Sequence, residues 1–193
     1  RGLLTGFPGL ARRLGERFPD ALRLAPLLAS QTLGEYEQLC AVTLVSQAQT
    51  LLLREGLGLE PEAALGLSLG ETNALIAFGF WDNPGEMIGE FAAAQTYERH
   101  IGGAFESAAT AWGETAPVDW ANWRIYAPLD KVRAAMAEHP RVEITIIYTP
   151  EDCVIGGPPE ECRAVARALG EGAGLAMQQH LVVHAEAMIP YRD

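Results

Sequence analysis

Apolar residues recur at helical intervals in several separate stretches of the first half of the chain. The clearest stretch covers residues 32–55, where leucines and valines return every three or four positions until glycines end the pattern. Further helices are predicted at Glu71–Phe80 and Glu86–Ala94. The segment Trp81–Gly85 separates them as a turn, because its Asn-Pro and Pro-Gly pairs both interrupt helices. Residues 95–118 are rich in Gly, Ala and Thr, and their pattern predicts no definite element.

The second half alternates strand-like and helix-like segments in the order β-α-β-β-α-β. The six segments are Asn122–Ala127, Pro128–Glu138, Val142–Tyr148, Asp152–Ile155, Pro158–Leu169 and Leu175–Val183. The third turns back into the fourth across Thr149 and Pro150, and Gly156 and Gly157 are interpreted as a turn before the second helix. This order of elements is typical of a ferredoxin-like subdomain.

A G-x-S-x-G pentapeptide, Gly66–Gly70 (GLSLG), lies between an apolar segment and a predicted helix. Glu62–Leu69 is predicted to be a short strand, so the serine of the motif, Ser68, would stand on a strand-to-helix turn. That setting is typical of a nucleophile elbow. Both glycines are expected to be required, because so tight a turn leaves no room for a Cβ atom. The competing interpretation is an ordinary glycine-rich connection.

A serine hydroxyl is a weak nucleophile until a neighbouring base takes its proton. The candidates are the four histidines His100, His139, His180 and His184. His184 fits best, because it follows directly after the last predicted strand, where a loop can present it. His139, at a predicted helix end, is expected to be exposed. A structural or surface role for His184 stays open on this evidence.

The turn also predicts a site for a developing negative charge. The N–H of Leu69 lies at the start of the helix that follows the serine, where helix N–H groups and the helix dipole stabilise an oxyanion. A second donor from another loop is required, and the sequence identifies none.

Composition and charge narrow the function classes. The 193 residues are 49% hydrophobic and 20% charged, which is typical of a folded protein, and the net charge of −11 argues against a nucleic-acid partner. The three cysteines have no metal-ligand spacing, so no metal is predicted, and reduced thiols in the cytoplasm are expected. Leu39–Leu53, the most apolar run, is too short and too polar to cross a bilayer. The chain, from Arg1 to Asp193, is interpreted as an excerpt of a longer protein.

Three motifs in order resemble the malonyl-CoA:acyl-carrier-protein acyltransferase family, which includes the acyltransferase domains of fatty acid and polyketide synthases. Gly66–Glu71 (GLSLGE) is similar to the family's G-H-S-x-G-E elbow. Thr149–Gly157 (TPEDCVIGG) is similar to its N-S-P-x-x-x-V-I-A/S-G hairpin, and His184–Pro190 (HAEAMIP) to its H-x-x-x-M-x-P segment. The resemblance runs from about Gly6 to the end of the chain.

The resemblance implies a fold and a division of the chain. The expected class is α/β, with an α/β-hydrolase-like core that carries the elbow and a ferredoxin-like small subdomain. Residues 1–118 would form part of the core, 119–183 the small subdomain, and 184–193 a return into the core. The family's first segment, with its G-Q-G-x-Q motif, would precede Arg1, and a later segment that orients the histidine would follow Asp193.

The resemblance also implies site roles. An acyl-CoA would acylate Ser68, with His184 as the general base and then the acid, and the phosphopantetheine thiol of an acyl carrier protein would accept the acyl group. The N–H of Leu69 would form half of the oxyanion hole. The substrate-binding positions would be Leu67, Val182 and Val183. The partners implied are the carrier protein, acyl-CoA and other synthase domains, with no bound cofactor.

Departures from the family pattern bear on the substrate. Leu67 stands where the family has histidine. The family's malonyl-binding arginine would fall within Ala92–Ala94, and Arg99, the nearest arginine, would need a local insertion. The three residues before His184 are all aliphatic. These features predict an uncharged acyl group, because a buried carboxylate without an arginine partner is costly.

The departures, together with Phe80–Pro84 and the Trp112–Trp123 stretch, make the chain most similar to the acyltransferase of bacterial polyunsaturated fatty acid synthases. Two alternatives stay open. A serine hydrolase or thioesterase of the α/β-hydrolase type shares the elbow but orders its triad differently and lacks the ferredoxin-like insertion. A non-catalytic, acyltransferase-like docking domain is the other.

Overall fold

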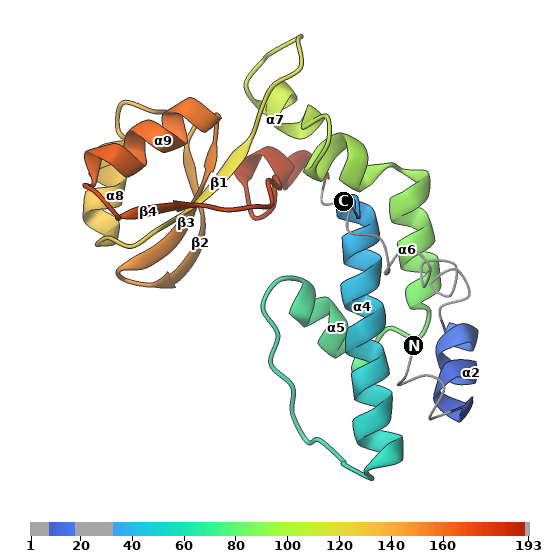
Figure 1. The fold of residues 1–193 in the computed structure, drawn as a ribbon. Helices are drawn as coiled ribbons and strands as arrows, with labels where there is room; N and C mark the ends of the chain where they lie inside the picture. The colour runs from blue at the N-terminus through green and yellow to red at the C-terminus, as the bar shows by residue number, and fades with distance from the viewer. Residues whose placement is uncertain (1–7, 18–32, 192–193) are drawn as a thin grey trace. The chain divides into compact units, whose positions relative to one another are not determined.

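The computed structural model describes residues 8–17 and 33–191, and the chain divides into two compact units (Figure 1). Unit 1 is Arg1–Ala94 and unit 2 is Gln95–Asp193. The predicted division into residues 1–118, 119–183 and 184–193 rests on the family resemblance and stays a prediction.

Unit 1 is helical throughout its regular elements. They are α2 (Pro8–Arg17), α4 (Glu35–Leu51) with its π-helical continuation η2 (Leu52–Gly56), α5 (Leu69–Ala77) and α6 (Pro84–Ala93). The long helix predicted at residues 32–55 is confirmed. It begins after Gly34, whose N–H donates to the Glu37 carboxylate at 2.9 Å, so that the side chain satisfies a backbone donor at the helix start. The helix after the elbow begins at Leu69, earlier than predicted.

The core of unit 1 joins all four helices. Its buried members are Leu14, Cys40, Leu44, Leu51, Ile76 and Ile88. The hydroxyl of Tyr36 on α4 also donates to the carbonyl of Ile88 on α6 at 3.1 Å. Of the apolar positions that recur at helical intervals in α4, Leu39, Leu44 and Leu51 are buried. Val42 and Val45 are about half exposed, so only part of the predicted apolar face packs against neighbours.

The strand predicted at Glu62–Leu69 is wrong for the described part of unit 1. Residues 57–67 contain neither strand nor helix, and no residue of 8–17 or 33–94 is in a strand. A strand exists only where a neighbour receives its backbone hydrogen bonds, and the described residues of this unit offer none.

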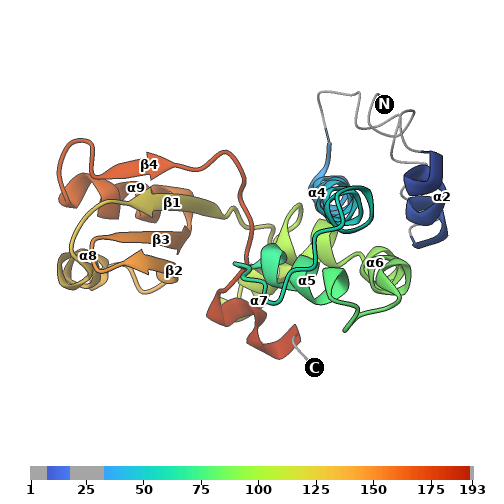
Figure 2. The ribbon, with the colours of Figure 1, turned by 90° about the horizontal axis from the view of Figure 1, so that it is seen from below.

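Unit 2 contains a four-stranded antiparallel sheet. Its elements are β1 (Ala121–Ile125), α8 (Leu129–Met136), β2 (Glu143–Thr149), β3 (Asp152–Gly157), α9 (Pro159–Ala168) and β4 (Gly174–Ala176). The strands lie in the order β2-β3-β1-β4 (Figure 2), and both helices cover the same face. The predicted order of elements is therefore the observed one.

Strand alternation determines which side chains meet the helices. Ile125, Cys153 and Ile155 project from β1 and β3 into a core with Val132 of α8 and Val165 of α9, and all five are completely buried. Each of the isoleucine and valine side chains contributes about 1.5–3 kcal/mol by leaving water.

Two predictions about the ends of the strands are wrong. The last strand stops at Ala176 instead of reaching Val183, because the side chain of Asn122 takes over the pairing and accepts the N–H of Leu181 at 2.7 Å. Gly156 and Gly157 belong to β3 and are not a turn. A Cβ on Gly156 would lie 2.4 Å from the Trp120 ring, so glycine lets that ring rest on the strand.

The segments before and after the sheet pack together in a third cluster. They include η3 (Thr96–Ile101), α7 (Glu106–Ala111) and η4 (Glu186–Tyr191). The buried members of the cluster are Ala108, Trp120, Val182, Ala185 and Ala187. Trp112 stacks on Trp120 with ring centroids 5.8 Å apart, so these two tryptophans pack within the cluster.

Candidate functional site

Ser68 stands on a strained turn. It lies directly before α5 with φ 54° and ψ −121°, a region that L-residues other than glycine rarely occupy. A Cβ on Gly66 would lie 2.2 Å from the carbonyl of Gly70, so the first glycine of the motif is required, as predicted. The same prediction is wrong for Gly70, where a Cβ would meet nothing within 4 Å. Strain of this kind persists only where the surroundings hold it, and it concentrates at functional sites.

The first turn of α5 continues directly from this serine. The N–H of Gly70 donates to the carbonyl of Leu67, and that of Glu71 to the carbonyl of Ser68, both at 2.9 Å. The N–H of Leu69 precedes these bonds at the positive end of the helix, where backbone donors stabilise negative charge. The oxyanion role of Leu69 is compatible with this position and stays a prediction.

Both Ser68 and Leu67 are exposed, and 62% of Leu67 is accessible to solvent. Within unit 1, a reagent in solution can therefore reach the serine. The role of Leu67 in substrate binding stays a prediction.

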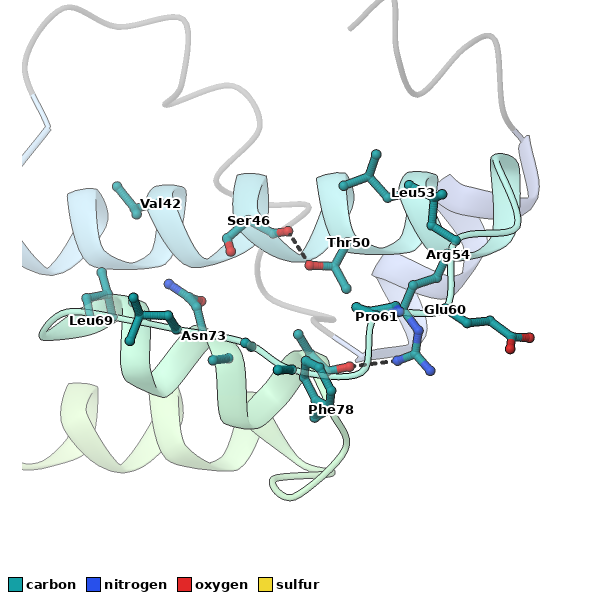
Figure 3. Close-up of a pocket in the computed structure, with 17 residues that line it drawn as sticks. Val42, Ser46, Thr50, Leu53, Arg54, Glu60, Pro61, Leu69, Asn73 and Phe78 are labelled. Carbon is teal, nitrogen blue, oxygen red and sulfur yellow. Dashed lines mark hydrogen bonds between the residues drawn. The ribbon is translucent and has the colours of Figure 1, made fainter.

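A cavity of about 730 Å³ lies behind the turn, between α4, residues 59–65 and α5 (Figure 3). Leu69 and Gly70, which directly follow Ser68, line the cavity, but Ser68 itself does not. The walls are mostly apolar. Figure 3 also shows Arg54 of η2 donating to the carbonyl of Ala77 at 2.8 Å, at the far end of α5.

His184 lies in an anchored loop of unit 2. Its backbone φ is 56°, its side chain is exposed, and it directly precedes buried Ala185. The N–H of Val182 donates to the carbonyl of Ile101 at 2.7 Å, and the N–H of Glu186 donates to the Glu143 carboxylate at 2.6 Å. These two bonds hold the backbone on both sides of the histidine.

Glu143 is a residue that the sequence analysis missed. Burial raises the pKa of its carboxyl, although the hydrogen bond from Glu186 opposes the shift. No local signal could have identified it, because it begins a strand far from the loop along the chain and only the fold brings the two together.

The other predicted substrate residues differ in exposure. Val182 is completely buried in the third cluster, and Val183 is half-buried beside it. Their contact with a substrate stays a prediction. Ser68 belongs to unit 1 and His184 to unit 2, and their pairing stays a prediction as well.

The remaining histidines have structural surroundings. The Nδ1 of His180 accepts the N–H of Asn122 at 3.4 Å. His139, predicted to be exposed, is half-buried and lies 3.7 Å from the Glu161 carboxylate, because α8 ends against α9. The ring of His100 lies 4.5 Å from that of Tyr191.

Arg99 is already occupied by a carboxylate of its own unit. Its guanidinium donates three hydrogen bonds of 2.7–3.1 Å to Glu106. Hydrogen bonding to Glu106 raises the pKa of Arg99, and the same contact lowers the pKa of Glu106. Glu106 was not identified from the sequence, because it lies in the segment without a predicted element.

Within residues 8–17 and 33–191, no three His, Cys, Asp or Glu side chains are grouped so that they could hold a metal ion. None of the helices in that part of the chain has both the length and the apolar content needed to cross a membrane.

Comparison with known proteins gives one curated relative and several solved structures. A polyunsaturated fatty acid synthase polypeptide of Thraustochytrium sp. is 28% identical over 156 residues, which are 77% of this chain and 8% of that polypeptide. A malonyl-transacylase in complex with the acyl-carrier protein of a type II polyketide synthase has a TM-score of 0.69 at 20% identity and matches 96% of this chain. The chain has the fold of the malonyl-CoA:acyl-carrier-protein acyltransferase family. The resemblance predicted from three motifs is thereby confirmed.

Other structures with this acyltransferase fold are similarly related. The acyltransferase domain of the second module of the salinomycin polyketide synthase has a TM-score of 0.63 at 23% identity, over 95% of this chain. The MCAT of Streptococcus pneumoniae has a TM-score of 0.64 at 21% identity, over 92% of this chain. The chain spans 40–60% of the length of these structures. No family model matches it. The structures named here are acyltransferases and transacylases, the enzyme class that was predicted.

Proposed function

We propose that this chain carries the nucleophile and the base of an acyltransferase that moves an acyl group from acyl-CoA to an acyl carrier protein in polyunsaturated fatty acid or polyketide synthesis. The observation that carries the proposal is the conformation of Ser68, a non-glycine residue with positive φ directly before a helix. The sequence relationship to a polyunsaturated fatty acid synthase favours that pathway class.

The proposed reaction has two balanced halves. His184 takes the hydroxyl proton of Ser68 as Oγ attacks the thioester carbonyl, and the N–H of Leu69 stabilises the oxyanion. The C–S bond then breaks, and the CoA sulfur leaves with the proton from the imidazole. In the second half, His184 takes the proton of the carrier-protein thiol as its sulfur attacks the acyl-enzyme ester. The ester C–O bond then breaks, and the imidazole gives the proton to Oγ of Ser68.

We further propose that the acyl group is uncharged. Arg99 forms an ion pair with Glu106. If a malonyl carboxylate took the place of Glu106 at Arg99, the Glu106 carboxylate would lose its ion-pair partner. The aliphatic side chains of Val182 and Val183 agree with an apolar acyl group.

The test is intact-mass detection of the acyl adduct on the full-length protein, with malonyl-, acetyl- and longer acyl-CoA. An adduct is expected with the uncharged thioesters and none on Ser68→Ala. Strong preference for malonyl-CoA would refute the uncharged acyl group. Rapid hydrolysis without transfer to a carrier protein would favour a thioesterase, and no adduct with any thioester would favour a docking domain.

The finer description of the fold is also a proposal. Residues 57–67 carry Leu or another apolar residue at every odd position, which is the period of a strand. Leu65 is fully exposed, as are large parts of Leu57 and Leu59. We propose that strands of an α/β-hydrolase-like sheet, in the longer polypeptide, cover these exposed leucines and fill the 730 Å³ cavity, and that the sheet of unit 2 is a ferredoxin-like subdomain.

Substitution of Leu65 in the full-length protein tests the sheet. If strands cover this position, Leu65→Asp lowers the free energy of unfolding by about 1–3 kcal/mol, because a charge is then buried. Glu62→Asp, at an exposed position of the same segment that does not line the cavity, is the control. An unchanged stability of Leu65→Asp would contradict the sheet.

A further inference from the structure

Gln47 is a polar residue in an otherwise apolar part of unit 1. It lies on α4, its side chain is completely buried, and its Nε2 donates to the main-chain carbonyl of Asn73 at 3.0 Å. Asn73 lies in the second turn of α5, the helix that begins directly after Ser68. The bond therefore connects α4 to the helix that carries the strained turn.

The turn and the start of α5 form one rigid arrangement. The α-carbon of Gly66 lies so close to the backbone of Gly70 and Glu71 that no Cβ would fit. A small shift of α5 along or around its axis would therefore move Gly66 and change the backbone of Ser68. A residue that fixes α5 consequently fixes the direction of the serine hydroxyl.

A second side chain connects the same two elements at the other end of α5. Arg54 lies in η2, the π-helical continuation of α4, and donates to the carbonyl of Ala77 (Figure 3). This side chain is exposed, so water competes for its hydrogen bond. The buried bond from Gln47 is the one that water cannot replace, and it is the nearer of the two to the serine.

We propose that Gln47 is a positioning residue for Ser68, acting through the carbonyl of Asn73. The inference rests on the proposed function, in which Ser68 is the nucleophile. Gln47 touches neither substrate nor reacting atoms in this scheme. It restricts α5 to the register in which the turn presents the hydroxyl.

Stability alone does not account for an amide at this position. The Oε1 of Gln47 and the Oγ1 of Thr43 are buried and have no hydrogen-bond partner among the described residues. A buried polar group that is only half satisfied is unfavourable compared with an apolar side chain of the same shape. Gln47→Met should therefore preserve or raise the melting temperature while it removes the bond to α5.

The experiment measures the labelling of Ser68 by a serine-directed phosphonate in the full-length protein, as a function of reagent concentration. Gln47→Met is expected to lower the maximal labelling rate roughly tenfold, because misplaced reacting groups lose rate steeply. The half-saturating reagent concentration should stay unchanged, since the binding surface is intact. Thr43→Val is the matched control: it removes a buried hydroxyl from the same face of α4, one turn away, and should label like the wild type.

Each outcome is decisive. Absence of labelling in the wild type would overturn the proposed function and, with it, this inference. Labelling of Gln47→Met and Gln47→Leu at the wild-type rate would overturn the positioning role alone. Failure of both variants to fold, or a fall in melting temperature that accounts for the lost rate, would make Gln47 a structural residue and would also overturn it.

Discussion

The two units hold their chemistry in place by different means. Unit 2 has a sheet whose strands pair in register and whose helix-covered face is buried. The loop of His184 is hydrogen-bonded to this sheet through Glu143. Unit 1 carries a strained serine on the end of a short helix, next to a segment whose leucines are exposed. The comparison indicates that a sharp turn can be specified locally by a glycine and one neighbouring helix, whereas a sheet requires all of its strands.

The largest effect is expected from the glycine that makes the turn possible. Gly66→Ala places a Cβ 2.2 Å from the backbone of Gly70, so the turn must open and Ser68 must lose its conformation. Phosphonate labelling of Ser68 should fall roughly a hundredfold, the loss that a misplaced nucleophile produces. Gly70→Ala, with open space around the added methyl group, should label within a few-fold of the wild type. Equal rates for the two variants would mean that the turn is not held by this contact.

The contacts of the two glycines also show which features of unit 1 can be predicted from the sequence. The motif Gly66–Gly70 predicted the turn and the helix after it, because a tight turn is a local property of the chain. The strand at Glu62–Leu69 was not found, because strand pairing depends on partners that lie elsewhere. The helix at 106–111 was missed, since an Ala- and Thr-rich segment carries little periodicity.

The residues that contact the candidate site residues or the helix after Ser68 could not be predicted from the sequence, for the same reason as the strand. The roles of Gln47, Glu106 and Glu143 depend on contacts between elements far apart along the chain. The β-α-β-β-α-β order of unit 2 was predictable, because each of its strands and helices has its own period. The early end of β4 was not, because it depends on the side chain of Asn122.

The next largest effect concerns the scaffold of unit 2. Ile155→Ala removes a completely buried side chain from the centre of the sheet and should lower the free energy of unfolding by about 2–5 kcal/mol. Ile147→Ala, at a half-exposed position of the edge strand β2, should cost much less. Denaturant titration followed by tryptophan fluorescence measures both. Similar losses would show that the edge strand is covered in the full-length protein.

Thiol reactivity compares the two units without changing the chain. Cys40 reports opening of unit 1, whereas Cys153 and Cys162 report opening of unit 2, and all three are buried. Burial raises the pKa of Cys153 and raises that of Cys162 to about 12, so their reactive thiolate is scarce while unit 2 is closed.

At pH 8, Cys40 is expected to react with a disulfide reagent roughly tenfold faster than either thiol of unit 2, because the less supported unit opens more often. Mass spectrometry after timed labelling and digestion identifies the order. Reaction of Cys153 or Cys162 before Cys40 would reverse the comparison of the two units.

The smallest effect is expected from an ion pair on the sheet face away from the helices. Arg124 donates two hydrogen bonds of 2.6 and 2.9 Å to Asp152, and its guanidinium lies over the rings of Tyr126 and Tyr148. Hydrogen bonding to Arg124 holds the pKa of Asp152 below its ordinary value. A lowered pKa in the folded state adds stability that is present above the pKa of the unfolded chain, about 3.9, and is lost as the pH falls through the lowered value.

Because Arg124 is partly exposed, this contribution is small and should fade with added salt. Arg124→Gln should return the pKa of Asp152 towards its ordinary value and flatten the loss of stability below pH 4, with NMR titration of the carboxyl carbon as the measurement. Arg141→Gln, which removes a comparable ion pair with Glu114, should leave the pKa of Asp152 unchanged. If Arg141→Gln shifted it equally, the cause would be the net charge of the unit and not the contact between Arg124 and Asp152.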